Sequence, residues 1–127
     1  MAEANLIGGW VAVLAGVISG AISGLFFHQE GWMGGYGSYP RRMVRLGHIS
    51  FFGLGFLNLF FAATAREIVL RPIFESIASC ALLAGVVTMP ACCFLSAWRK
   101  PFRHLFPIPV VSVLTGILAL LIGWWRP

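Results

Sequence analysis

Apolar residues dominate this chain, and its few polar residues divide it into four long apolar segments. Each segment approaches or exceeds the roughly 20 residues that an α-helix needs to cross about 30 Å of hydrocarbon. Charged side chains fall mainly between these segments. The pattern therefore predicts four membrane-spanning helices, at about residues 6–27, 43–63, 73–98 and 109–125.

Composition leads to the same class of protein. The chain has 127 residues, of which 59% are hydrophobic and only 10% are charged, and its mean hydropathy is +0.88. A soluble domain of this size cannot bury so much apolar surface. We expect residues 1–127 to form a single polytopic membrane domain, an all-α integral membrane four-helix bundle with short loops. The first segment should remain as a helix, because no Lys or Arg precedes it, whereas a signal peptide begins with a positive region.

Basic residues accumulate at one end of the predicted bundle. Four crossings place residues 28–42 and 99–108 on one face of the membrane and both termini on the other. Six of the nine Lys and Arg residues lie at the first face, namely Arg41, Arg42, Arg45, Arg99, Lys100 and Arg103. Since Lys and Arg concentrate on the cytoplasmic side, we expect these loops in the cytoplasm and both termini outside, in a membrane of the bacterial inner-membrane type. The net charge of +5 thus reflects topology, and nucleic acid is not an expected partner.

Small residues recur every four positions in three of the predicted helices. The first helix carries Ala12, Gly16, Gly20 and Gly24; the third carries Ser76, Cys80, Ala84, Thr88, Cys92 and Ser96; the fourth carries Thr115, Ala119 and Gly123. Strips of this kind let helix backbones approach closely. They predict tight helix packing, with the first helix against the third or fourth. In the second helix, Asn58 is expected to hydrogen-bond to another helix.

The only three histidines of the chain, His28, His48 and His104, fall on the predicted cytoplasmic side. Neutral imidazole is a common ligand for haem iron and copper, which predicts a haem b or copper site at this rim. His48 and His28 form the best pair if they face each other at equal depth, and His104 joins them if its loop folds back.

Other residues near that depth extend the candidate site. Guanidinium groups pair well with carboxylates, so Arg41, Arg45 and Arg103 are candidate partners for haem propionates. Met89, Cys92 and Cys93 are soft donors suited to copper, although packing explains these three residues better. Histidines within a turn of an interface also hydrogen-bond to head groups, carbonyls or water. A structural membrane subunit without a cofactor is therefore the alternative.

The chain has few carboxylates, which bears on two activities, hydrolytic catalysis and small-molecule export. The chain has no aspartate and only four glutamates, and Glu67 and Glu75 lie across the membrane from the histidines, so hydrolytic catalysis is not expected. The dimensions resemble those of the small multidrug exporters, but those carry a membrane-embedded glutamate in the first helix and this helix has none, which makes a small transporter the less favoured alternative.

The glycine- and aromatic-rich loop "HQEGWMGGYGSYPRRM" is typical of a docking surface. We expect a subunit or assembly partner of a larger membrane complex, with a respiratory or redox complex as the candidate type, that contacts lipid and other membrane subunits.

Overall fold

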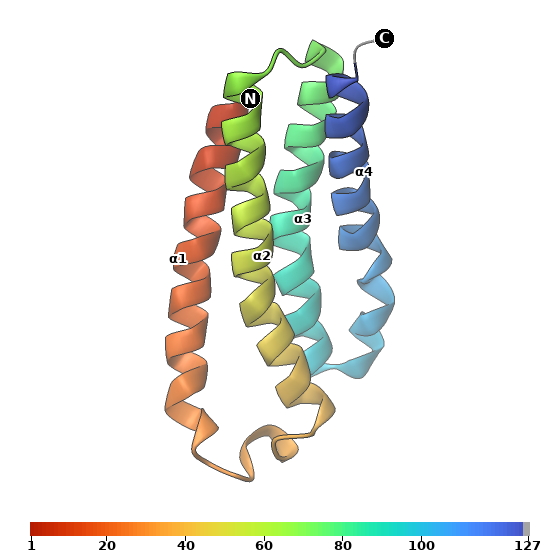
Figure 1. Cartoon of the computed structure of the whole chain (residues 1–127). Coiled ribbons are helices and arrows are strands. Elements are labelled where there is room, and N and C mark those ends of the chain that lie inside the picture. The colour runs from red at the N-terminus through yellow and green to blue at the C-terminus, as the bar shows by residue number, and fades with distance from the viewer. Residues whose placement is uncertain (126–127) are drawn as a thin grey trace.

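The structure, a computed structural model, describes residues 1–125 as an all-α four-helix bundle (Figure 1). The long helices are α1 (Ala2–Phe27), α2 (Tyr39–Glu67), α3 (Pro72–Trp98) and α4 (Pro107–Trp124), with short 3-10 helices η1 (Trp32–Gly34) and η2 (Lys100–Leu105) in two of the connections. All four long helices have the length and apolarity to cross a membrane. The start of α1 and the end of α4 lie at one end of the bundle, and the connections that contain η1 and η2 lie at the other (Figure 1).

The four predicted segments are confirmed, although their limits are corrected. The helix α1 begins at Ala2 rather than near residue 6, α2 extends four residues beyond each end of 43–63, and α4 spans Pro107–Trp124 rather than 109–125. Hydropathy marks only the part of a helix that lies in hydrocarbon, whereas local capping sets its end. At the start of α2, for example, the side chain of Ser38 accepts a hydrogen bond from the Arg41 amide, and a proline occupies the first turn.

The helices pack in chain order, which corrects the predicted partner of the first helix. Extensive contacts join α1 to α2, α2 to α3 and α3 to α4, and α1 meets α3 over a smaller area. The small-residue strip of α1 faces α2. Backbone and aromatic rings of α2 occupy the space that larger side chains on this strip would fill. A Cβ atom at Gly9 would lie 2.9 Å from the carbonyl oxygen of Gly55, and one at Gly16 would lie 2.8 Å from the ring of Phe52.

This close approach can be tested with a pair of glycine variants. We expect Gly9→Ala to lower the free energy of unfolding by about 1–2 kcal/mol, because the added methyl meets Leu59 and the Gly55 carbonyl in a packed interface. Gly24→Ala is the control, since a Cβ there meets nothing within 4 Å, and it should be neutral or stabilising. Unfolding of both variants in detergent micelles measures the difference. Equal stability of the two would contradict the close α1–α2 packing.

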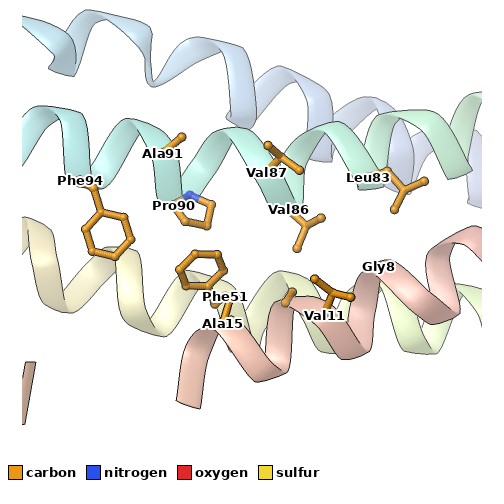
Figure 2. A pocket seen from close by; sticks show the side chains of 11 residues that line it. Gly8, Val11, Ala15, Phe51, Leu83, Val86, Val87, Pro90, Ala91 and Phe94 are labelled. Carbon is orange, nitrogen blue, oxygen red and sulfur yellow. The ribbon is translucent and has the colours of Figure 1, made fainter. Parts of the chain in front are cut away.

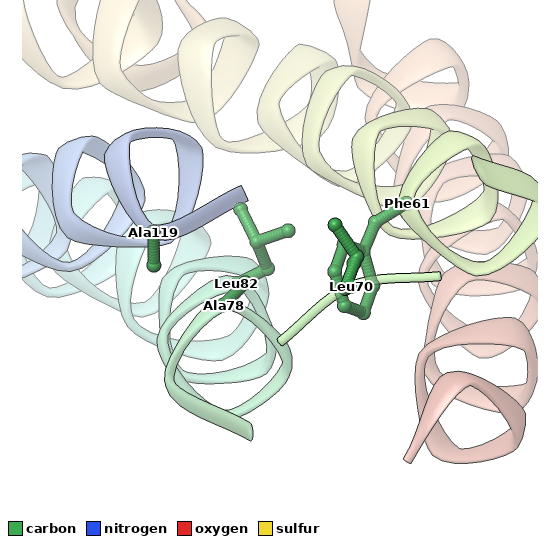
Figure 3. Packing of buried hydrophobic residues seen from close by; sticks show 5 residues of the cluster. All are labelled: Phe61, Leu70, Ala78, Leu82 and Ala119. Carbon is green, nitrogen blue, oxygen red and sulfur yellow. The ribbon is translucent and has the colours of Figure 1, made fainter. Parts of the chain in front are cut away.

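A buried apolar cluster joins α2, α3 and α4 near the end that carries the termini. It contains Phe61, Leu70, Ala78, Leu82 and Ala119 (Figure 3). On α4 the face that packs here consists of Gly116, Ala119 and Gly123, which are buried, whereas Thr115 of the predicted strip is exposed. A helix rotates by about 40° relative to a four-residue repeat at each step, so one strip of that period cannot stay in the interface along its whole length.

A fully hydrogen-bonded polar cluster lies among α1, α2 and α3. The Asn5 side-chain amide donates to Asn58 Oδ1 at 2.7 Å and to the Ser79 carbonyl at 3.2 Å, and the Ser79 hydroxyl donates to Asn5 Oδ1. Asn58 in turn donates to the Leu54 and Leu82 carbonyls at 2.9 and 3.2 Å. All three residues are buried. The prediction that Asn58 bonds to another helix is confirmed, and the polar cluster ties three helices together.

Candidate functional site

The structure separates the three predicted ligand histidines. His48 is half-buried on α2 and lines a pocket between α1 and α2. His28 follows the last residue of α1 and is exposed. His104 is exposed on η2, where it lines a shallow depression of about 280 Å³ with Lys100, Pro101 and Arg103. Since η2 packs against α3 and α4, His104 and Arg103 lie on a different part of the molecule from the pocket.

His28 and His48 lie at different depths. The imidazole of His48 rests directly against Gly20 of α1, and His28 follows eight residues later. At 1.5 Å per residue, eight residues span about 12 Å along a helix. A haem held by two imidazoles requires both histidines to lie at one depth, and His28 and His48 do not. Among residues 1–125, no group of three or more His, Cys, Asp and Glu side chains is placed to hold a metal ion.

The pocket at His48 has a volume of about 370 Å³ and is built by two helices. It is lined by Gly20, Ser23, Gly24 and Phe27 of α1 and by Arg45, His48 and Ile49 of α2. Gly24 leaves the α1 wall open, because a Cβ there would meet nothing within 4 Å, whereas the His48 imidazole covers Gly20. The pocket therefore combines apolar and glycine lining residues with one imidazole, one guanidinium and one hydroxyl.

A hydrogen bond with Ser19 fixes the orientation of the His48 ring. The Ser19 hydroxyl donates to the Gly16 carbonyl at 3.0 Å, and its oxygen lies 3.2 Å from His48 Nδ1. A hydroxyl has a single proton to donate. When that proton goes to the Gly16 carbonyl, Nδ1 is the donor in the second contact and Nε2 carries the lone pair of the ring. An edge contact with Phe52, at 5.3 Å between ring centroids, supports the ring from the other side.

Arg45 is held at the mouth of the pocket by Tyr36. Its guanidinium lies 4.3 Å from the centre of the Tyr36 ring and donates to the Tyr36 carbonyl at 3.4 Å. This bond uses a single donor of a group that has several. Arg45 also precedes His48 by three residues, so the two side chains occupy one face of α2, with the guanidinium nearer to the loop.

Arg41 serves the loop rather than the pocket. Its side chain is 1% exposed, and the guanidinium donates to the carbonyls of Phe27, Gln29 and Glu30 at 2.6, 3.3 and 3.3 Å. The same group packs against the rings of Phe27, Trp32 and Tyr36. Arg41 therefore closes the carbonyl end of α1 and fixes the loop that follows.

The sulfur-containing candidates lie away from His48. Cys92 and Cys93 are buried on α3, and a Cβ at Gly47 would lie 3.1 Å from Cys93 Cβ, which places Cys93 in the α2–α3 contact. Met89 is half-buried one turn earlier on α3. None of the three lines the pocket at His48.

A second cavity, of about 410 Å³, lies between α1 and α3. Figure 2 shows Phe51 and Pro90 between its walls, with Val11 and Ala15 on one side and Val86 and Val87 on the other. All of its lining side chains are apolar or glycine, and none can ligate a metal or titrate. The groove follows from the packing order, because α1 meets α3 over a smaller area than it meets α2.

Comparison of the chain with protein-family models, curated proteins and solved structures finds no match. Sequence reasoning singled out His48 and Arg45 but missed Ser19, which orients the imidazole. Its only signal was a serine one residue before a glycine of the α1 strip, and that signal is equally typical of simple packing.

Proposed function

We propose that this integral membrane protein is a subunit of a larger membrane assembly and contributes His48 as a ligand to haem b. The observation that carries the proposal is the Ser19–His48 contact beside the pocket: in the tautomer in which Nδ1 donates to Ser19, Nε2 keeps the lone pair that a metal needs. Ligating histidines commonly donate their other ring N–H to a fixed acceptor in this way. The basic residues around the pocket favour a cytoplasmic position for this end of the bundle.

The surroundings of His48 favour haem over copper. Gly24 leaves open space in the pocket wall, and the Arg45 guanidinium is suited to pair with a propionate. Copper in its reduced state prefers thiolate or thioether ligands, and Cys92, Cys93 and Met89 do not line this pocket. Haem b, when bound, would supply one-electron redox chemistry. The chain would supply the ligand nitrogen, the propionate partner and a largely apolar enclosure.

The single imidazole of the pocket is the reason to propose an assembly. A bis-imidazole haem needs a second ligand at the depth of His48, and neither His28 nor His104 offers one within the described chain. The ordered loop held by Arg41 supports the same view, because a fixed surface with aromatic side chains suits a protein contact.

Absorption spectroscopy and metal analysis of the protein purified from haem-replete membranes test the proposal. We expect a Soret band and stoichiometric iron, both lost in His48→Ala. Ser19→Ala should weaken haem binding by about 10–100-fold, since partners that orient a ligand contribute on that scale. His104→Ala is the matched control and should retain the spectrum. A colourless, metal-free wild-type protein would overturn the proposal and leave a structural subunit without a cofactor.

A further inference from the structure

The proposed haem site lacks a second imidazole within one chain, and that imidazole must lie at the same depth in the membrane as His48. The pocket contains one imidazole, and His28 lies about 12 Å farther along the helix axis. A second ligand must therefore come from another molecule whose imidazole lies level with His48. This requirement rests on the proposed function.

The pocket lies on an exposed face that α1 and α2 share, here called the lateral face. On α2 the face follows the spacing of one helical stripe, with Ile49, Gly53, Phe56 and Phe60, and on α1 it includes Val17, Ala21 and Gly24. All seven residues are exposed. A Cβ atom at Gly24 or at Gly53 would meet nothing within 4 Å. The lateral face is therefore apolar and has glycine on both helices, where another backbone can approach closely.

We infer that a second copy of this chain covers the lateral face and completes the haem site. A two-fold axis along the membrane normal makes the same surface meet itself. It brings His48 of both copies to one depth by symmetry, which the residues of a single chain do not achieve. Each copy would then supply one imidazole ligand to the haem.

The arginines fit the same arrangement. Arg45 lies three residues before His48, nearer to the loop end, and each copy supplies one such guanidinium. Haem carries two propionates on a single edge. Two copies therefore offer one guanidinium to each propionate, both at the loop end, while the largely apolar walls enclose the remainder of the macrocycle.

The stoichiometry of the purified holoprotein tests this inference. Native mass spectrometry in mild detergent should show one haem for two chains, with the spectrum of low-spin, six-coordinate iron. Gly53→Leu is the decisive variant, because Gly53 does not line the pocket and has open space for a side chain. We expect it to be monomeric and to retain at least about tenfold less haem. Thr115→Leu, on the exposed surface of α4, is the matched control and should remain a haem-containing dimer.

A mixed dimer gives an independent readout. Wild-type and His48→Ala chains with different tags can be co-expressed and isolated by tandem purification. If both copies ligate the iron, the mixed dimer should lose the low-spin spectrum. Haem bound to a monomer, full haem in Gly53→Leu or an unchanged spectrum in the mixed dimer would overturn the two-fold site while leaving the proposed function intact. A wild-type protein that binds no haem would overturn both.

Discussion

Arg41→Ala is expected to lower the free energy of unfolding by about 3 kcal/mol, because it removes three hydrogen bonds from a charged donor and the contacts of that donor with aromatic rings. The carbonyls of Phe27, Gln29 and Glu30 would lose their shared partner. The Phe27 carbonyl lies in the last turn of α1, where backbone acceptors have no partner inside the helix, and the other two carbonyls lie in the loop that follows. Unfolding in detergent micelles measures the loss, and faster proteolysis of the loop should accompany it.

Two further substitutions separate the geometry of Arg41 from its charge. Arg41→Lys keeps the positive charge, but a single ammonium cannot reproduce the planar guanidinium that reaches three carbonyls and stacks on rings, so an intermediate loss is expected. Arg42→Ala changes the neighbouring exposed arginine and should cost less than about 0.5 kcal/mol. If Arg41→Ala proved as harmless as Arg42→Ala, the role of Arg41 as the organiser of the loop would have to be abandoned.

The second large effect is expected at Asn58. Asn58→Leu keeps a similar volume, but it deprives the Asn5 amide of one acceptor and the Leu82 carbonyl of its donor from α2. We expect a loss of about 2 kcal/mol, above the average for a single interhelical hydrogen bond in a membrane, because two such bonds end together and buried polar groups are left without partners. Chemical or thermal unfolding measures this loss.

A double-mutant cycle checks the explanation. Asn5→Leu alone should also destabilise the bundle, and the double variant Asn5→Leu/Asn58→Leu should lose less than the sum, since each single change already breaks the bond that they share. Thr88→Ala is the control, because the Thr88 hydroxyl bonds only to the Ala84 carbonyl of its own helix, and its effect should be small. Strictly additive losses would mean that Asn5 and Asn58 do not act as one cluster.

The sequence alone determined the class of the protein and the number of its helices. Long apolar segments separated by charged loops permit little else, because backbone groups in lipid must be satisfied within each helix. It also predicted which residues lie at the loop end of the bundle, since position along a spanning helix fixes depth. His48 and Arg45 could be named as site candidates for that reason, and Asn58 as a contact between helices.

Only the tertiary structure decided which faces of the helices meet. Four-residue strips on three helices predict close packing somewhere, but they do not name the partner: α1 packs mainly on α2 and meets α3 over a smaller area. Rotation and register likewise placed Ser19 beside His48, set His28 about 12 Å from that level, and committed Arg41 to backbone carbonyls. These outcomes depend on how side chains fit between neighbouring helices, and a pattern along one chain does not contain that information.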